Sequence, residues 1–427
     1  MARQPKGETH MTKTNRQWFV GVDWASSKHD VSLTDDSGKI IGRRIFAHSG
    51  EGLAQMADWL LRESGAMAAD IQVAIETPHG AVVETLLERG FKTYSINPKQ
   101  LDRFRDRFTA AGAKDDSRDA DVLASSLRTD GKAFRALMPA DPAIVELREW
   151  SRMAEAHGQD LRRYMSRLHE QLQRYYPAFL ALGGDADAAW KLALLELAPT
   201  PAMARSLPRA KVARLIEAHH VRCHDVDGVL AILRAPPPAV SDATVAAASA
   251  HVRTLLKSIR LAAEQSKEAN AMLERLTKAL AEPEDNASGQ TVQRDAAILR
   301  SSPGLGRIIL ATLLTEAPQA VHERDYHALR CNGGIAPVTR QSGKRRYVVR
   351  RLACNRRLRN ALYHWARNAI QKDARIRAKY EALRARGQSW ARALRTIADH
   401  LLYIACAMLR SGTLYDKNHG SEAIKSA

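Results

Sequence analysis

The sequence predicts an α/β domain at the N-terminus, followed by a remainder that is almost entirely helical. Two observations lead to this expectation: short strand-like runs alternate with helical patterns up to about residue 135, and helical periodicity dominates afterwards. With 427 residues, the chain has room for about two to four domains. Hydrophobic residues make up 45% and charged residues 26%, a balance typical of a globular protein that folds in water.

Three strands are expected first, over residues 18–24, 30–35 and 39–47, with a turn at 35–38. A helix (53–62), a strand (71–76), a helix (82–89), a strand (91–96) and a closing helix (115–128) should follow. A three-stranded meander followed by alternating helices and strands is the order of a ribonuclease H-like fold. We therefore expect such a domain over 17–135, preceded by a basic, disordered tail over 1–16.

Two long amphipathic helices are predicted next, over 143–176 and 243–281, within a helical connector that spans 140–285. Apolar residues of the second helix recur at two heptad positions, so the pair could form a coiled-coil arm. Two helices of an ordinary bundle would give the same pattern. The proline-containing segment between them should hold small helices and loops.

A small helical C-terminal domain is expected over 291–415, after a polar linker at 282–290 and before a tail over 416–427. It opens with Pro303-Gly304-Leu305-Gly306 before an apolar helix. Such text is typical of the hairpin in a helix-hairpin-helix element, whose backbone N–H groups hold phosphate. A purely structural turn is an equally good interpretation.

The charge of the chain indicates a nucleic-acid partner. The net charge is +18, and residues 340–399 hold eighteen Lys and Arg against three acids. The candidate nucleic-acid-binding residues are Gly304, Gly306, Arg340, Lys344, Arg345, Arg346, Arg356, Arg357 and Arg359.

Neither export nor membrane insertion is predicted. The four cysteines form no CxxC pair, which excludes a zinc knuckle or a disulfide framework and favours a reducing compartment. There is no secretory leader and no run of about 18 apolar residues. We expect a cytoplasmic protein.

Four carboxylates are candidate metal ligands: Asp23 in the first strand, Glu76 at the end of a later strand, and Asp116 and Asp119 on one helix face. An unpaired Asp in an apolar strand is costly unless a cation compensates it. Oxygen ligands suit Mg²⁺ or Mn²⁺, and such ions assist phosphoryl transfer. The alternative is a solvated, charged helix start; spacing alone also leaves Asp115 open in place of Asp116.

Ser342 is a candidate nucleophile because it lies in a loop rich in Gly, Arg and Lys. Cationic side chains would stabilise its alkoxide and the phosphorane-like transition state. Taken alone, a turn that contacts phosphate is the commoner use of such a loop.

Taken together, these motifs resemble the DEDD transposases of the IS110 insertion-sequence family, relatives of the Piv DNA invertases. The resemblance rests on Gly21-Val22-Asp23 with Lys28-His29-Asp30, Glu76-Thr77 with Gly80, Lys114-x-Asp116-x-x-Asp119-Ala120, Pro303-Gly304-x-Gly306, Gly334-Ile335-Ala336-Pro337 and Gln341-Ser342-Gly343. The departures are Pro78-His79 after the Glu-Thr pair and the additional Asp115.

The resemblance implies a RuvC-like, ribonuclease H-type first domain, a coiled-coil connector and a nucleophilic serine at Ser342. It favours Asp116 over Asp115. It also implies a dimer or tetramer that pairs donor with target DNA, guided by a structured RNA from the element, in a bacterial cytoplasm and on the nucleoid when active.

Our hypothesis from the sequence is therefore a DNA transposase in which the four acids hold Mg²⁺ and Ser342 forms a covalent serine–DNA intermediate. Whether the acids and the serine join in cis or in trans is left open. The alternatives are a RuvC-like Holliday-junction nuclease that uses metal-activated water, and a non-catalytic nucleic-acid-binding protein.

Overall fold

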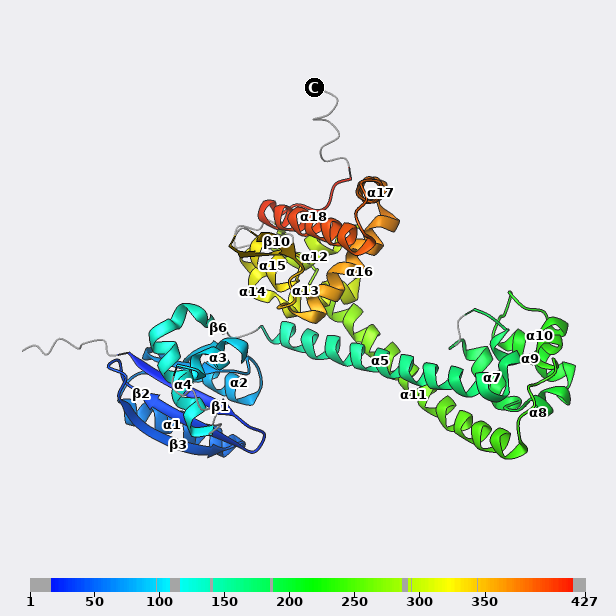
Figure 1. The fold of residues 1–427 in the computed structure, drawn as a ribbon, viewed down its shortest axis with the longest axis horizontal. Helices are drawn as coiled ribbons and strands as arrows, with labels where there is room; N and C mark the ends of the chain where they lie inside the picture. The colour runs from blue at the N-terminus through cyan, green and yellow to red at the C-terminus, as the bar shows by residue number, and fades with distance from the viewer. Residues whose placement is uncertain are drawn as a thin grey trace, which may run out of the picture. The chain divides into compact units, whose positions relative to one another are not determined.

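The computed structural model describes residues 17–96, 98–107, 116–138, 141–184, 187–285, 291–292, 294–343 and 345–417. The chain forms two compact units, 1–140 and 141–427 (Figure 1). Three predicted segments lie wholly or partly outside the described residues: the tail over 1–16, the linker at 282–290 from residue 286 on, and the tail over 416–427 from residue 418 on. No helix of the described part is both long enough and apolar enough to cross a membrane.

The first unit is built on one mixed sheet in the order β3-β2-β1-β4-β5-β6. Its strands are β1 (Trp18–Trp24), β2 (Lys28–Thr34), β3 (Ile40–Ala47), β4 (Ile71–Ile75), β5 (Lys92–Ser95) and β6 (Arg135–Ala136). The first three strands pair antiparallel as a meander, β1, β4 and β5 run parallel, and β6 closes the edge antiparallel to β5. The five predicted strands are confirmed. The two-residue β6 was not predicted, because it is too short to show periodicity.

Helices cover both faces of this sheet: α1 (Gly50–Ser64), α2 (Ala81–Glu88), α3 (Pro98–Arg105) and α4 (Asp116–Asp130). Val20 and Val73 point to the face on which Met56 of α1 and Leu86 of α2 pack. Phe19 belongs to a second cluster on the opposite face, which includes residues of α3 and α4. Strand β1 is thus buried on both sides, which explains its nearly continuous apolar sequence.

The second unit contains the two long helices, α5 (Pro142–Tyr175) and α11 (Asp242–Ala279), packed along each other (Figure 1). The start of α5 and the end of α11 share one hydrophobic cluster, whereas the end of α5 and the start of α11 share another, so the pair is antiparallel. The side chains of Asp141 and Ser241 cap the two N-termini. The predicted helical arm is confirmed, and coiled-coil packing within it stays a prediction.

Five short helices lie where α5 ends and α11 begins: α6 (Pro177–Leu180), α7 (Ala189–Leu197), α8 (Pro201–Arg205), α9 (Arg209–Ala218) and α10 (Val226–Leu233). Prolines start α6 and α8, since a helix needs no N–H at its first position. The buried Tyr175 hydroxyl donates to the Pro199 carbonyl at 2.6 Å and so fixes this group to the arm. This confirms the small helices expected for the proline-containing segment.

The opposite end of the arm carries the C-terminal helices α12 (Asp295–Arg300), α13 (Arg307–Glu316), α14 (Pro318–His322), α15 (Tyr326–Asn332), α16 (Arg356–Lys372), α17 (Ala374–Ala385) and α18 (Trp390–Ser411). Their core, around the fully buried Trp365, includes Leu147 of α5 and Leu273 of α11. The start of α5 and the end of α11 are therefore part of the C-terminal core.

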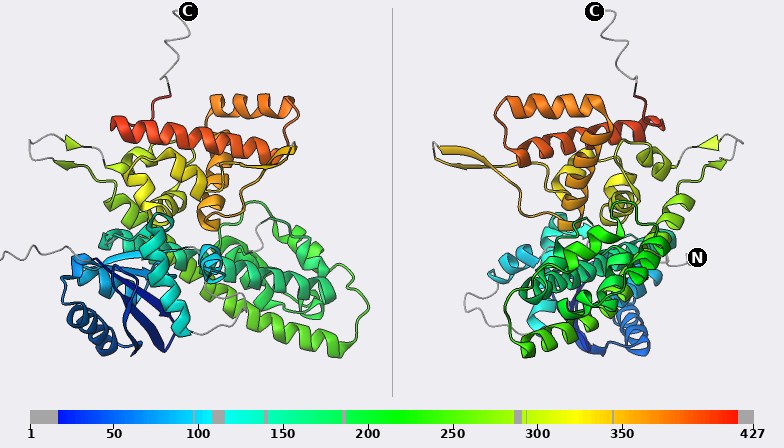
Figure 2. Two further views of the ribbon diagram at one scale, coloured as in Figure 1. Left: turned by 60° about the vertical axis from the view of Figure 1, so that its left-hand side comes forward. Right: turned by 90° about the vertical axis from the view of Figure 1, so that its right-hand side faces the viewer.

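The C-terminal part is not purely helical. Two hairpins accompany it: β7 (Glu284–Asp285) with β8 (Thr291–Val292), and β9 (Val338–Ser342) with β10 (Arg345–Val349). Both project from the helices in Figure 2. The second hairpin lies in the segment for which the sequence predicted a basic loop. Its charged, exposed strands lack the apolar alternation by which a strand is recognised.

Candidate active site and nucleic-acid interface

The register of β1 and β4 brings Asp23 and Glu76 to one edge of the sheet. Val22 pairs with Ile75 in this parallel ladder, and Asp23 and Glu76 are the next residues of the two chains. Neighbouring strands lie about 4.8 Å apart, so the two backbones are adjacent. Val22 and Ile75 belong to the cluster on the α1 and α2 face, so alternation directs Asp23 to the face that α4 covers.

Helix α4 packs very closely against β1 at Gly21. A Cβ atom on Gly21 would lie 1.9 Å from the Ala120 carbonyl oxygen and 2.7 Å from the Ala124 backbone nitrogen. Asp119 directly precedes Ala120 in the first turn of α4. Asp116 starts this helix, but its side chain lies outside the described residues, as does Asp115 altogether.

The carboxylate of Asp119 is occupied by Arg105, at the end of α3. Arg105 Nε donates to Oδ1 at 2.7 Å and Nη2 to Oδ2 at 2.8 Å, while Nη1 donates to Asp102 at 2.7 Å. Burial disfavours the charged guanidinium, but its hydrogen bonds outweigh burial and raise the pKa of Arg105. Among the residues that the structure describes, no three His, Cys, Asp or Glu side chains gather as a metal site would require.

Asp30 is a further acid beside Asp23 that was not among the candidate ligands predicted from the sequence. It pairs with Asp23 across the antiparallel β1–β2 ladder, so both point to one face, and it is 8% exposed. Lys28 Nζ lies 3.6 Å from its Oδ2. Beside it the surface is hollowed by a cavity of about 460 Å³ that Asp30, Arg43 and Ala120 help to line. The signal in the sequence that could have indicated Asp30 as a candidate is its place seven residues after Asp23.

A pair of histidines, one of them buried, lies at the same edge of the sheet. His29 pairs with Trp24 in the β1–β2 ladder, is fully buried, and its Nε2 lies 2.9 Å from Nδ1 of His48. Burial, and then the nearby His48, lower the pKa of His29 below its ordinary value. The fold therefore favours the uncharged form of this histidine.

Ser342 ends β9 at the tip of an exposed hairpin. It pairs with Arg345, and Arg340 pairs with Tyr347. Side chains alternate along a strand, so Arg340, Ser342, Arg345 and Tyr347 share one face, whereas Thr339 and Arg346 belong to the other. Gly343 turns the chain with a φ of 55°, and Lys344, a predicted phosphate contact, lies outside the described residues. The serine and the acids belong to different units.

The Pro-Gly-x-Gly turn packs against α16. A Cβ atom on Gly304 would lie 2.4 Å from the Ala369 nitrogen, and Trp365 Nε1 donates to the Pro303 carbonyl at 3.1 Å. Close packing thus accounts for Gly304, which is the structural-turn interpretation. Gly306 is exposed at the N-terminus of α13 and remains a candidate for binding phosphate.

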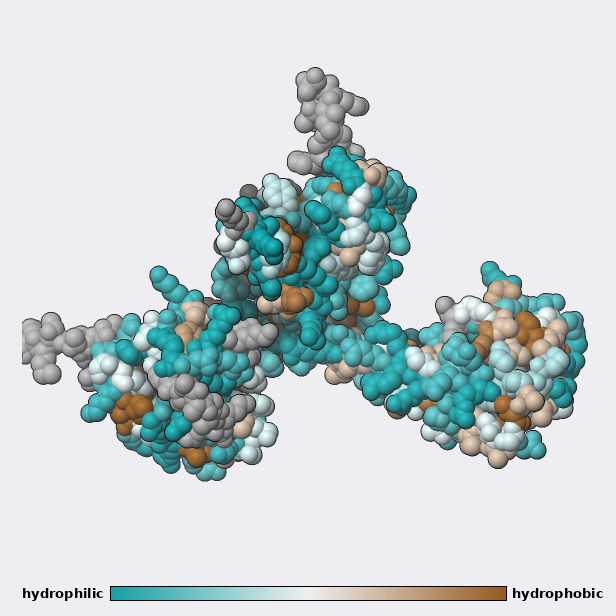
Figure 3. All heavy atoms as spheres, viewed as in Figure 1, coloured by the Kyte–Doolittle hydropathy of each residue, from teal (hydrophilic) through white to brown (hydrophobic). Residues whose placement is uncertain are grey.

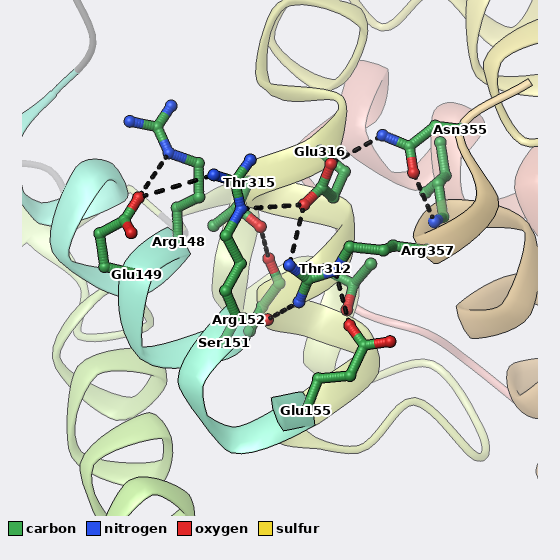
Figure 4. A network of polar contacts seen from close by, with 12 residues as sticks. Arg148, Glu149, Ser151, Arg152, Glu155, Thr312, Thr315, Glu316, Asn355 and Arg357 are labelled. Atoms are coloured by element: carbon green, nitrogen blue, oxygen red, sulfur yellow. Dashed lines mark hydrogen bonds and ion pairs between the residues drawn. The ribbon is translucent and has the colours of Figure 1, made fainter. Parts of the chain in front are cut away.

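Arg357, a predicted nucleic-acid contact, takes part in an internal network that ties α5 to α13 and α16 (Figure 4). Its Nε lies 2.8 Å from Glu155, its Nη1 lies 3.5 Å from the nearly buried Glu316, and its Nη2 donates to Ser151 at 3.2 Å. Arg152 also reaches Glu316. We therefore assign Arg357 to holding the arm against the C-terminal core.

The other predicted arginines are more accessible. Arg340, Arg345, Arg346 and Arg356 are exposed, and Arg359 is half-buried, with Nη1 3.9 Å from Cys354 Sγ. The C-terminal helices are covered mostly by hydrophilic residues on the face drawn in Figure 3. This surface suits contact with a polyanion.

Comparisons with known proteins point to transposases. Residues 20–177 match a family model described as "Transposase", and residues 296–381 match the model "Transposase IS116/IS110/IS902 family". The chain is 57% identical to "Putative transposase y4uE" of Sinorhizobium fredii over 211 residues, which are 49% of this chain and 59% of that relative.

Two further relatives extend over nearly the whole chain. "Mini-circle putative transposase for IS117" of Streptomyces coelicolor is 32% identical over 397 residues, 90% of this chain and 92% of the relative. "Insertion element IS110 uncharacterized 43.6 kDa protein" of the same organism is 25% identical over 418 residues, 93% of this chain and 95% of the relative.

Proposed function

Because the chain belongs to the IS116/IS110/IS902 family of transposases, we propose that it catalyses the metal-dependent DNA cleavage and rejoining that move an insertion sequence. The observation that carries this proposal is the placement of Asp23 and Glu76 at one edge of a mixed sheet, on a face approached by the helix that carries Asp119. A strand order of β3-β2-β1-β4-β5 with helices on both faces supports a RuvC-like, ribonuclease H-type domain.

The proposed ligands of Mg²⁺ or Mn²⁺ are Asp23, Glu76, Asp116 and Asp119. All four offer carboxylate oxygens, which these hard cations prefer. The backbones of Asp23 and Glu76 are neighbours, and the close approach of α4 over Gly21 brings the first turn of that helix to them. A bound divalent ion supplies stabilisation of the attacking and leaving oxygens during phosphoryl transfer. Asp30, which is buried beside Asp23, adds negative charge that favours the cation.

We propose Ser342 as the nucleophile. Its Oγ forms a bond to the DNA phosphorus as its proton leaves to solvent, and the bond from phosphorus to the deoxyribose oxygen breaks, with that oxygen taking up a proton. The serine–DNA ester keeps the phosphodiester energy for rejoining. The shared face of Arg340, Ser342 and Arg345 supports this role, because guanidinium groups stabilise the charge that develops on the phosphoryl oxygens.

The nucleophile is tested by trapping a protein–DNA adduct on a denaturing gel. Ser342→Ala should abolish both the adduct and strand exchange while DNA binding persists, whereas Thr339→Ala, on the other face of the same hairpin, should leave both intact. Metal-dependent cleavage by Ser342→Ala at an unchanged rate would instead establish a nuclease that uses activated water. Asp23→Asn should abolish cleavage in either case.

Arg345 and Arg346 are neighbours in sequence with different proposed roles. Arg345→Gln should slow adduct formation more than it weakens DNA binding, since this side chain shares the face of Ser342. Arg346→Gln should weaken DNA binding and reduce its salt dependence by about one phosphate contact. Equal effects of the two substitutions on adduct formation would contradict the proposal that Arg345, and not Arg346, acts beside Ser342.

We further propose that donor and target DNA are paired by a homo-oligomer guided by a structured RNA. The net charge of +18 supports a nucleic-acid partner, and the resemblance to the family supports a guide RNA and multimers. Sequencing the RNA that co-purifies with the protein, and measuring the molar mass of the complex, test both statements.

A further inference from the structure

We propose that Arg105 is the internal counter-ion of Asp119 in the metal-free protein, and that a divalent cation must displace it to bind. Arg105 is then a positioning residue for the acidic site. This inference rests on the proposed function, because it assumes that Asp119 is a metal ligand.

The geometry of the pair carries the argument. Two nitrogens of one guanidinium donate to the two oxygens of one carboxylate, at 2.7 and 2.8 Å. Such a fork-to-fork pair is among the strongest charged hydrogen-bonded contacts in proteins. The Asp119 side chain is 14% exposed and that of Arg105 is 26% exposed, so water screens the pair only in part. While this contact holds, each oxygen of Asp119 already accepts a charged hydrogen bond, and a cation that approached it would meet the positive charge of Arg105.

Several acids lie on the strands that α4 approaches, and Lys28 Nζ lies 3.6 Å from one of them, Asp30. Asp23, Asp30 and Glu76 lie on neighbouring strand positions close to the first turn of α4, and Asp30 is almost fully buried. Negative side chains at these positions attract a cation. The guanidinium of Arg105 supplies that cation at Asp119, and a divalent ion would supply it with greater charge.

The structure also provides a partner for Arg105 after displacement. Nη1 donates to Asp102 at 2.7 Å, one turn earlier on α3, and the Asp102 side chain is 65% exposed. Arg105 can therefore leave Asp119 without becoming unpaired. Displacement costs the hydrogen bonds to Asp119 but leaves the contact within α3 in place.

The test is calorimetric titration of the full-length protein with Mn²⁺ alone. Arg105→Gln should bind Mn²⁺ roughly tenfold more tightly than the parent protein, because no internal cation competes for Asp119. Arg105→Lys keeps the charge but loses the planar fork, so its affinity should fall between the two. The control is Arg107→Gln, which removes an arginine two residues further along the chain and its exposed pair with Asp130, and should leave the affinity unchanged.

A second measurement is the thermal midpoint of the metal-free proteins. Arg105→Gln should lower it, and added Mn²⁺ should restore the loss. Equal or weaker Mn²⁺ binding by both Arg105 variants overturns the inference while leaving the metal site intact. If the parent protein binds Mn²⁺ no better than Asp119→Asn, the proposed metal site itself is overturned. Should Arg105→Gln fail to fold, the comparison of Arg105→Lys with the parent still decides the question.

Discussion

Replacing Gly21 by Ala tests whether the approach of α4 to β1 builds the acidic corner. The added Cβ would lie 1.9 Å from the Ala120 carbonyl oxygen and 2.8 Å from the Leu123 Cβ. All of the crowding atoms belong to one helix, and two of them are backbone atoms that cannot rotate away. The helix must therefore move off the sheet, and Asp119 must move with it.

The size of the effect follows from these distances. Ordinary contact needs about 3.5 Å, so α4 must back away by roughly 1.5 Å over β1. Overpacking of a dense interior costs about 1–3 kcal/mol, and a shift of a whole helix belongs at the upper end. We expect a loss of about 3 kcal/mol in the free energy of unfolding, together with loss of cleavage, since a misplacement of about 1 Å can cost a hundredfold in rate.

Urea unfolding of the full chain, with hydrogen exchange to localise the change to β1 and α4, measures this effect. Gly50→Ala is the matched control, because its Cβ would meet nothing within 4 Å on the same unit. It should be neutral or slightly stabilising, by up to about 1 kcal/mol. A stability of Gly21→Ala within about 0.5 kcal/mol of the parent, with normal exchange in α4, would refute the reasoning.

Three other predictions concern stability. Because the pKa of His29 is lowered in the folded protein, the unfolded chain takes up a proton at a higher pH than the folded one does. The contribution of His29 to stability is therefore complete above the ordinary histidine pKa of about 6.5 and is lost as the pH drops below it. His29→Gln should reduce the difference in urea midpoint between about pH 7.5 and pH 5.5. Glu316→Ala should lower the free energy of unfolding in urea by about 2 kcal/mol, because it leaves Arg152 of α5 and Arg357 of α16 with fewer acceptors. Its control is the exposed Glu149→Ala, which should cost less than about 0.5 kcal/mol. Trp365→Phe should lower the thermal midpoint, by an amount equivalent to about 2 kcal/mol, through the lost bond to the Pro303 carbonyl and the unfilled volume; an unchanged midpoint would contradict that contact.

Most helices and strands could be predicted because their burial is periodic. Strand β1 is apolar on both faces, and α11 repeats apolar residues at two heptad positions that the structure buries. The hairpin of β9 and β10 escaped prediction because its pairing depends on a two-residue turn and not on a buried face. A periodic pattern of apolar residues therefore reveals a helix or strand only where one of its faces packs against a hydrophobic core.

The candidate ligands and the nucleophile stay predictions, and what the sequence could not show is which side chains of distant segments pair with one another. Charge density predicted a nucleic-acid surface but could not separate Arg357 from Arg356, since the partners of Arg357 lie on α5, some 200 residues earlier. In the same way, Asp119 could be named as a candidate ligand but its contact with Arg105 could not. Carboxylates and guanidinium groups of distant segments become specific pairs only when the fold brings them together.

The acidic corner follows from the central place of β1 in the sheet. Asp23 is the next-to-last residue of this strand, with Asp30 as its partner on β2 and Glu76 beside it after β4. No edge strand could bring two acids to a third in this way, because it has a neighbour on one side only. Gly21 lies two residues earlier on the same face, and because it has no side chain, the helix that carries Asp119 can pack closely against the strand. One short strand thus positions acids from three other segments, which is why a single methyl group at residue 21 should affect both folding and DNA cleavage.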